Sequence, residues 1–167
     1  MQECDGLLIQ AQEAAQAVIH KLSAKSYSLA LAESCTAGLV SSLLAEISGA
    51  SKTLWGSFVC YTKEAKVSLL GLDSAALEKY GLVSEETARA MAGGVLQKSG
   101  ADLAASVTGL AGPEGDGSSV PVGTVWVAAA MRSSEPEARE FHFTGSRNEV
   151  RLRAAIAVLE CIQDALT

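Results

Sequence analysis

The chain is poor in aromatic residues, in histidine and in positive charge. Of its 167 residues, 5% are aromatic and 49% are hydrophobic, so we expect a core built from Ala, Leu and Val. The formal net charge of -6 excludes the broad basic surface that general nucleic-acid binding needs. No hydrophobic run reaches the length of a membrane span, and no charged, then apolar, leader is present. We expect one domain over residues 1–167, with no nucleic-acid or membrane partner.

The four cysteines lack the spacing of a metal or redox site. Cys4, Cys35, Cys60 and Cys161 form no C-x-x-C pair and have no histidine at ligand spacing. The pattern is typical of a cytoplasmic protein with free thiols. We expect no metal site.

The most informative segment is LALAESCTAG, residues 29–38. An apolar, strand-like run ends at an acid, and small polar residues then lead into a helical pattern. A strand-to-helix turn lifts such residues out of the sheet and directs backbone N–H groups at whatever lies there. Ser34 is therefore a candidate nucleophile, with the adjacent Cys35 as the alternative. Thr36 to Gly38 form a candidate anion or oxyanion cradle.

Periodicity and capping residues predict alternating strands and helices. The expected helices cover residues 7–23, 39–47, 62–71, 73–81, 84–99 and a last helix that follows 144–148 and ends at 166. The expected strands cover residues 28–32, 53–61, 103–107, 122–131 and 138–143. Buried strands separated by helices favour a three-layer α/β/α sandwich. Its sheet should be mixed and mostly parallel, with a C-terminal antiparallel hairpin.

Scarcity of histidine narrows the chemistry. A Ser-His-Asp arrangement needs a histidine, and only His20 and His142 are present. Both are expected at the surface, since His142 alternates with Phe141 and Phe143, which should face the core. Lysine is then the base that remains for Ser34.

The segment YTKEAK, residues 61–66, supplies that lysine. If Thr62 caps a helix, Lys66 lies at its fourth position, near the positive end of the helix dipole. That placement and any burial lower the pKa of the amine towards the range of a general base. Lys63 should add like-charge repulsion, and Tyr61 is placed to relay a proton or hold the Ser34 hydroxyl. Taken alone, these residues also fit an ordinary exposed helix with a solvated lysine.

A glycine-rich segment follows the strand predicted over residues 103–107. Thr108, Gly109 and Gly112 begin it, and glycines at this density let backbone N–H groups converge on a phosphate. A surface hairpin explains the glycines equally well, and the segment is neither a Walker A loop nor a G-x-G-x-x-G fingerprint. Arg147, at the start of the last helix, is placed to meet a phosphate with two N–H groups, or to be solvated.

Four motifs resemble one known family. The segments ESCTAG (33–38), YTKEAK (61–66), TGLAGP (108–113) and PVGTVW (121–126) are similar to those of the CinA C-terminal-domain family, in the same order. The resemblance extends from about Leu7 to Leu166. Enzymatic members of the family are nicotinamide-nucleotide amidohydrolases. The family commonly has glycine where Ala37 stands and asparagine where Lys63 stands. These departures put a close backbone approach and the substrate preference in question.

The resemblance implies a function and a set of site residues. Ser34, Tyr61 and Lys66 fall on the family's catalytic positions, and no cofactor is required. The expected substrate-binding residues are Glu33, Cys35, Thr36, Ala37, Gly38, Thr108, Gly109, Gly112 and Arg147. The expected reaction is deamidation of nicotinamide mononucleotide, by a homo-oligomer.

Two other functions stay open. A regulatory module could hold the same nucleotide without catalysis. An acyl-serine enzyme of the β-lactam type is weaker, because S-x-x-K spacing is absent around Ser34.

Overall fold

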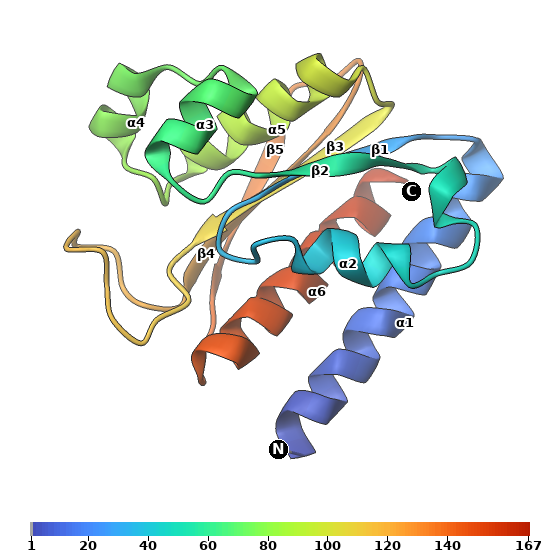
Figure 1. The fold of residues 1–167 in the computed structure, drawn as a ribbon, viewed down its shortest axis with the longest axis horizontal. Helices are drawn as coiled ribbons and strands as arrows, with labels where there is room; N and C mark the ends of the chain where they lie inside the picture. The colour runs from blue at the N-terminus through green and yellow to red at the C-terminus, as the bar shows by residue number, and fades with distance from the viewer. Residues whose placement is uncertain (1) are drawn as a thin grey trace.

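A five-stranded sheet forms the centre of the fold. In this computed structural model, which describes residues 2–167, the strand order is β2-β1-β3-β4-β5 (Figure 1). The strands are β1 (Leu29–Glu33), β2 (Leu54–Val59), β3 (Leu103–Gly109), β4 (Thr124–Met131) and β5 (Glu137–His142). β1 pairs in parallel with both β2 and β3, whereas β4 is antiparallel to its neighbours β3 and β5. β4 alone therefore runs against the other strands.

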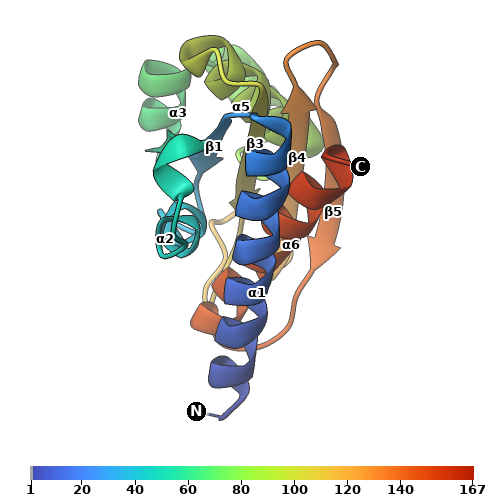
Figure 2. The same cartoon turned by 90° about the vertical axis from the view of Figure 1, so that its right-hand side faces the viewer.

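Helices cover both faces of this sheet. The helices α1 (Gln2–Lys25), α2 (Leu39–Ala45) and α6 (Arg147–Ala165) lie on one face, and α3 (Lys63–Leu70), α4 (Ser74–Tyr80) and α5 (Glu85–Ser99) lie on the other. The turned view separates the three layers, and the N-terminal turns of α1 project beyond the other helices (Figure 2). The expected three-layer sandwich with a mixed sheet is confirmed.

Alternating residues of the strands build the two cores. In β1, Leu29 and Leu31 join the core under α1, α2 and α6, whereas Ala30 and Ala32 join the core under α3 to α5. Successive side chains of a strand point to opposite faces, so one short apolar run serves both layers. The alanines leave room for α5 to pack close to the sheet.

Most predicted caps are confirmed. The side chains of Thr62, Asp73 and Ser84 accept hydrogen bonds from the first turns of α3, α4 and α5. α1 begins at Gln2 rather than at residue 7, because its first turns project from the body and need no apolar stripe. β2 ends at Val59 rather than at residue 61, and β4 begins at Thr124 rather than at residue 122.

Two further sequence expectations are tested by the fold. Across residues 2–167, no helix is both long and apolar enough to cross a membrane. All four cysteines are free thiols, and three of them are buried.

Candidate active site

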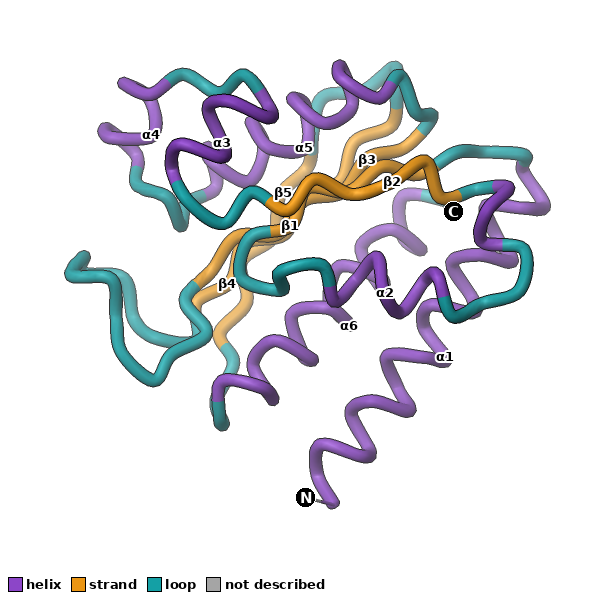
Figure 3. The backbone as a smooth tube through the Cα atoms, in the orientation of Figure 1, coloured by secondary structure: helices purple, strands orange, loops and turns teal. Residues whose placement is uncertain are grey.

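The candidate site lies where the parallel strands end. Ser34 follows β1, Tyr61 follows β2 by two residues, and Thr108 and Gly109 end β3. In open α/β sheets, ligands bind in the crevice at the carboxyl ends of the strands. Figure 3 shows the loops that meet there, including the long connection over residues 110–123. They enclose a cavity of about 210 Å³ lined by Ser34, Cys35, Tyr61, Lys66, Leu82, Val83, Thr108, Gly109, Leu110, Ala111, Gly112, Glu114, Asp116 and Arg147.

The side chains of Ser34 and Lys66 are hydrogen-bonded to each other in this cavity. The Lys66 amine donates to the Ser34 hydroxyl oxygen at 2.9 Å and to the carbonyl of Cys60 at 2.9 Å. The side chain of Lys66, which α3 directs towards the sheet, is 1% exposed. Burial lowers the pKa of this amine, because the charged form loses its water. The lowered pKa predicted for Lys66 is confirmed, and the solvated-lysine alternative is wrong.

The two thiols beside this pair are held protonated. Burial raises the pKa of Cys35 to about 12 and that of Cys60 to about 11. A thiol is nucleophilic as the thiolate, so Cys35 is a poor alternative to Ser34. For Lys66, burial outweighs the opposing interactions with Cys60 and Cys35, which raise its pKa, so the pKa of the amine stays lowered.

Lys63 differs from the prediction. Its amine forms an ion pair with Glu78 of α4, and it does not line the cavity within the described part of the chain. The expected like-charge repulsion on Lys66 is therefore wrong. The side chain at the first position of α3 points along the helix surface, whereas the fourth position faces the sheet.

The Glu33 carboxylate fills the predicted anion cradle. It is 1% exposed and accepts five hydrogen bonds of 2.8–3.1 Å. The donors are the hydroxyls of Thr36 and Ser57 and the amides of Gly38, Val40 and Ser41. The first turn of α2 thus has an internal anion, which satisfies its free N–H groups and its positive dipole end. Glu33, Thr36 and Gly38 therefore hold the turn and do not line the cavity in the described part of the chain; their contact with substrate stays a prediction.

Ala37 likewise lies outside the cavity, and its contact with substrate stays a prediction. Its amide donates to the carbonyl of Ser34 at 3.0 Å, and the residue is exposed outside the cavity. Its backbone has φ 51°, which is rare for a residue with a side chain, and Gly38 follows with φ 92°. Alanine in place of the family's glycine therefore acts through backbone strain and not through crowding. The amides of Ala37 and Gly38 thus donate within the turn itself.

Arg147 spans the mouth of the cavity. Its guanidinium donates to the hydroxyl of Tyr61 at 2.7 Å and to the carbonyl of Gly112. The start of α6, the segment after β2 and the glycine-rich loop are thereby joined. Tyr61 is 51% exposed, and the hydrogen bond that the structure gives its hydroxyl joins it to Arg147 rather than to Ser34. A proton relay through Tyr61 is therefore not assembled in this state.

The glycine-rich loop forms one wall of the cavity. Gly109 and Gly112 line it, and a side chain would not fit at either: a Cβ would lie 2.8 Å from the Thr124 carbonyl oxygen or 2.6 Å from a methyl group of Val122. Close approach to the start of β4 thus accounts for both glycines. Thr108 lines the cavity while its hydroxyl donates to the carbonyl of Leu82 at 2.7 Å.

Sequence reasoning missed the opposite wall. Leu82 and Val83, in the connection from α4 to α5, form that wall, and Glu114 and Asp116 extend the wall made by the loop. The hydrogen bond from the Thr108 hydroxyl to the Leu82 carbonyl holds this connection at the site. The two residues are far apart in the sequence, so no local sequence pattern predicts the contact.

Both histidines lie at the surface, as the sequence predicts. His20 and His142 are both exposed, and Phe141 and Phe143 pack against the core. Over residues 2–167, no group of three or more His, Cys, Asp or Glu side chains gathers as metal ligands would.

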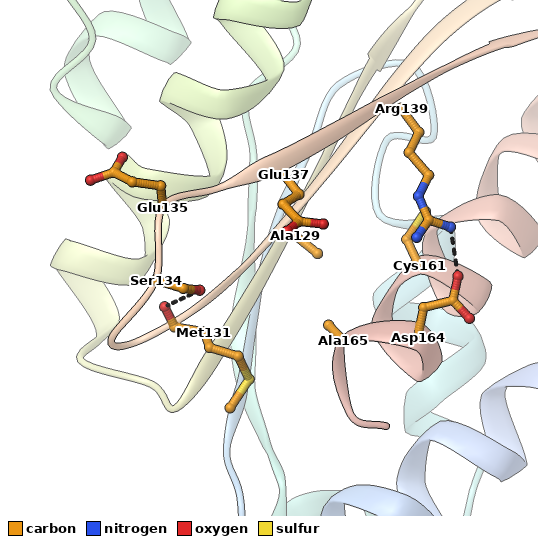
Figure 4. A pocket seen from close by; sticks show the side chains of 9 residues that line it. All are labelled: Ala129, Met131, Ser134, Glu135, Glu137, Arg139, Cys161, Asp164 and Ala165. Atoms are coloured by element: carbon orange, nitrogen blue, oxygen red, sulfur yellow. Dashed lines mark hydrogen bonds and ion pairs between the residues drawn. The ribbon is translucent and has the colours of Figure 1, made fainter.

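A second hollow lies at the opposite end of the sheet. It has a volume of about 270 Å³ and lies between the β4–β5 hairpin and the end of α6 (Figure 4). Met131, which lines it, pairs with Leu103 at the start of β3, far along the strand from Thr108. Its charged pair, Arg139 and Asp164, is half-exposed. It contains none of the predicted site residues.

Comparison with known proteins places these features in a family. The CinA C-terminal domain model matches residues 11–166. The nicotinamide-nucleotide amidohydrolase PncC of Enterobacter agglomerans is 43% identical over 139 residues, covering 83% of this chain and 85% of that protein. A CinA-like protein of Geotalea daltonii is 45% identical over 138 residues, covering 83% of this chain and 33% of that protein. The chain thus spans about a third of such longer relatives, as it does for the one from Syntrophomonas wolfei, at 32%.

Solved structures agree with this match. A CinA superfamily protein of Klebsiella pneumoniae superposes with a TM-score of 0.90 at 31% identity, covering 93% of this chain and 97% of that one. The competence/damage inducible protein CihA of Agrobacterium tumefaciens gives 0.89 at 37% identity, covering 94% and 95%. From the four motifs, the fold and these matches, we conclude that this chain belongs to the CinA C-terminal domain family.

Proposed function

We propose that this protein hydrolyses the carboxamide of nicotinamide mononucleotide to the carboxylate and ammonia, within pyridine nucleotide salvage. The observation that carries the proposal is the 2.9 Å hydrogen bond between the buried Lys66 amine and the Ser34 hydroxyl. A nucleophile and its base within hydrogen-bond reach are the signature of covalent catalysis. The substrate class is supported by the relative named nicotinamide-nucleotide amidohydrolase, which is 43% identical.

In the proposed reaction, neutral Lys66 is the general base. The Ser34 hydroxyl donates its proton to the lone pair of the amine as its oxygen attacks the carboxamide carbon. The Cys60 carbonyl, 2.9 Å from the amine, accepts one of the N–H groups and fixes the direction of that lone pair. The amides of Cys35 and Thr36 are the candidates to stabilise the oxyanion.

The second half of the reaction regenerates the serine. Protonated Lys66 gives its proton to the amide nitrogen, which leaves as ammonia when the C–N bond breaks. The acyl group then remains on Ser34 as an ester. Water then attacks this ester with Lys66 again as base, and the acid nucleotide leaves. Atoms balance as amide plus water gives carboxylic acid plus ammonia.

Arg147 is the proposed phosphate ligand. It lines the cavity, and its guanidinium bonds the neutral oxygens of Tyr61 and Gly112. A phosphate is a stronger acceptor for a guanidinium than either. Binding would therefore release the Tyr61 hydroxyl, which stands at the mouth of the cavity and becomes available to the dyad.

Ammonia release from nicotinamide mononucleotide tests the proposal. The native protein should release ammonia, and Ser34→Ala should release none at equal folded concentration. Ser134→Ala is the matched control, because this serine is exposed beside the second hollow and should not change the rate. Equal release from native protein and Ser34→Ala would move the nucleophile elsewhere. Saturable binding without release from either would favour the non-catalytic nucleotide-binding module.

A further inference from the structure

We propose that Glu33 is a positioning residue that sets the distance between Ser34 and Lys66 without touching the substrate. The inference rests on the proposed function for its kinetic readout alone. Its structural basis is the buried carboxylate that five donors enclose. In the described part of the chain Glu33 does not line the cavity, so it acts through the turn.

The side chain of Glu33 holds a turn that is strained. Ala37 has a left-handed backbone conformation with φ 51°, and a residue with a side chain persists there where the surroundings over-determine it. The carboxylate accepts from the Thr36 hydroxyl before Ala37, and from the amides of Gly38 and Val40 after it. The direction in which the turn presents Ser34 is thereby fixed from both sides.

The main chain of Glu33 holds the other half of the dyad. Its carbonyl accepts from the amide of Cys60 at 2.8 Å, and the carbonyl of Cys60 accepts from the Lys66 amine at 2.9 Å. The hydroxyl of Ser57, on the same strand β2, also donates to the Glu33 carboxylate at 3.0 Å. One residue therefore sets Ser34 through the next peptide bond and Lys66 through Cys60.

Glu33→Gln separates this role from packing. Glutamine has nearly the same shape, but it replaces one carboxylate oxygen by an NH2 group that faces N–H and O–H donors. At least one hydrogen bond to residue 33 is lost, and the new NH2 group faces an N–H or O–H donor of the turn or of β2, so the turn should relax. Glu46→Gln is the matched control: Glu46 is exposed at the end of α2 and its carboxylate accepts from Gln12.

Steady-state kinetics with nicotinamide mononucleotide give the first readout. For Glu33→Gln we expect kcat to fall at least about 30-fold with KM within about threefold, because misplacing a reacting atom acts on the chemical step. Glu46→Gln should keep both constants within about twofold. A kcat for Glu33→Gln within threefold of native would overturn the inference. So would a loss confined to KM, which would make Glu33 a substrate ligand.

A readout without the nucleotide keeps this inference separate from the proposed function. An arylalkyl sulfonyl fluoride forms a bond from sulfur to the Ser34 oxygen as fluoride leaves and Lys66 takes the proton. Intact-mass measurement gives the labelling rate at several pH values. Glu33→Gln should slow labelling at least about tenfold, with an unchanged pH midpoint, because Lys66 keeps its buried surroundings.

Two combinations of results distinguish this inference from the proposed function. Slower labelling of Glu33→Gln alongside a native protein that does not hydrolyse the nucleotide would support the inference and reject the proposed function. Native-rate labelling of Glu33→Gln alongside native hydrolysis would do the reverse. If Glu33→Gln does not fold, Ser57→Ala replaces it, since that change removes one of the five donors. It should slow labelling about threefold, and an unchanged rate would overturn the inference.

Discussion

The two hollows at opposite ends of the sheet show what distinguishes a site from a depression. The hollow beside Arg139 is the larger, at about 270 Å³ against about 210 Å³. Its ion pair with Asp164 has side chains 52% and 56% exposed, so water screens both charges. Lys66 in the other cavity is 1% exposed and bonded to a hydroxyl. Burial of one amine beside one hydroxyl, and not volume, distinguishes the end that we propose to be reactive.

The largest expected effect comes from replacing one basic side chain in each of the two hollows. Lys66→Met should lower kcat for amide hydrolysis by at least about 10³-fold, because the general base is lost while nucleotide affinity and fold persist. Arg139→Gln should leave kcat within about twofold, since an exposed ion pair contributes little. Kinetics and nucleotide titration by calorimetry measure both. Lys66→Met with more than a tenth of native kcat would remove the distinction between the two hollows.

The pH dependence of kcat/KM should also distinguish the cavity of Lys66 from the hollow beside Arg139. Because Lys66 acts as a neutral base, kcat/KM should rise about tenfold per pH unit until its lowered pKa is passed. Arg139→Gln should show the same profile. A profile that falls with rising pH over this range would contradict a lysine base.

The same pKa makes a prediction for stability. Between the lowered pKa of Lys66 and the ordinary value of 10.5, the unfolded chain binds more protons than the folded one. The free energy of unfolding should therefore rise with pH across that window and level off on either side of it. Urea unfolding of native protein should show this rise, and Lys66→Met should not. Parallel curves for the two proteins would count against a buried amine.

A smaller effect concerns the helix that carries Lys66. A Cβ on Gly94 of α5 would lie 2.9 Å from the Leu70 carbonyl oxygen at the end of α3, whereas one on Gly93 would lie 3.9 Å from Pro136. Gly94→Ala should lower the free energy of unfolding by about 1–3 kcal/mol and reduce kcat, because α3 must move. Gly93→Ala should raise the free energy of unfolding by about 0.5–1 kcal/mol, because alanine favours the helix more than glycine does. Equal effects from the two substitutions in urea unfolding would show that α3 is not held by this contact.

The smallest effect concerns backbone strain. Ala37 and Ser26 are the non-glycine residues with positive φ in the described chain, at 51° and 55°. Glycine at either position should raise the free energy of unfolding by up to about 1 kcal/mol, because relief of strain outweighs the added entropy of the unfolded chain. Thermal unfolding measures the gain. Ala37→Gly should change kcat by less than about threefold, and Ser26→Gly not at all; a large loss at Ala37 would mean that the strain itself serves the reaction.

Local chemistry made much of the fold predictable. Thr62, Asp73 and Ser84 cap helices in their own segments, and the alternation in β1 assigns residues to the two faces without knowledge of the partners. The start of α1 was missed because its exposed turns lack the apolar stripe that marks a packed helix.

The site was predictable where sequence motifs carried it. The contact between Ser34 and Lys66 joins residues 32 positions apart, and family resemblance rather than spacing brought them together. The donors around Glu33 come from the turn, from α2 and from β2, so its role needed the folded arrangement. An acid directly before a turn into a helix was the available signal, because a carboxylate suits the positive end of the helix dipole.

The reversal of β4 has a consequence for how such a protein diversifies. The dyad is carried by β1 and α3, whereas the glycine-rich wall belongs to residues 110–123, which join neighbouring antiparallel strands β3 and β4. Doubling the length of a flexible connection costs only about 0.6 kcal/mol in closure entropy. Insertions and deletions there should therefore change the free energy of folding little, and they would reshape one wall of the cavity while Ser34 and Lys66 stay in place. A change of ligand would thus need no change in this buried serine–lysine pair.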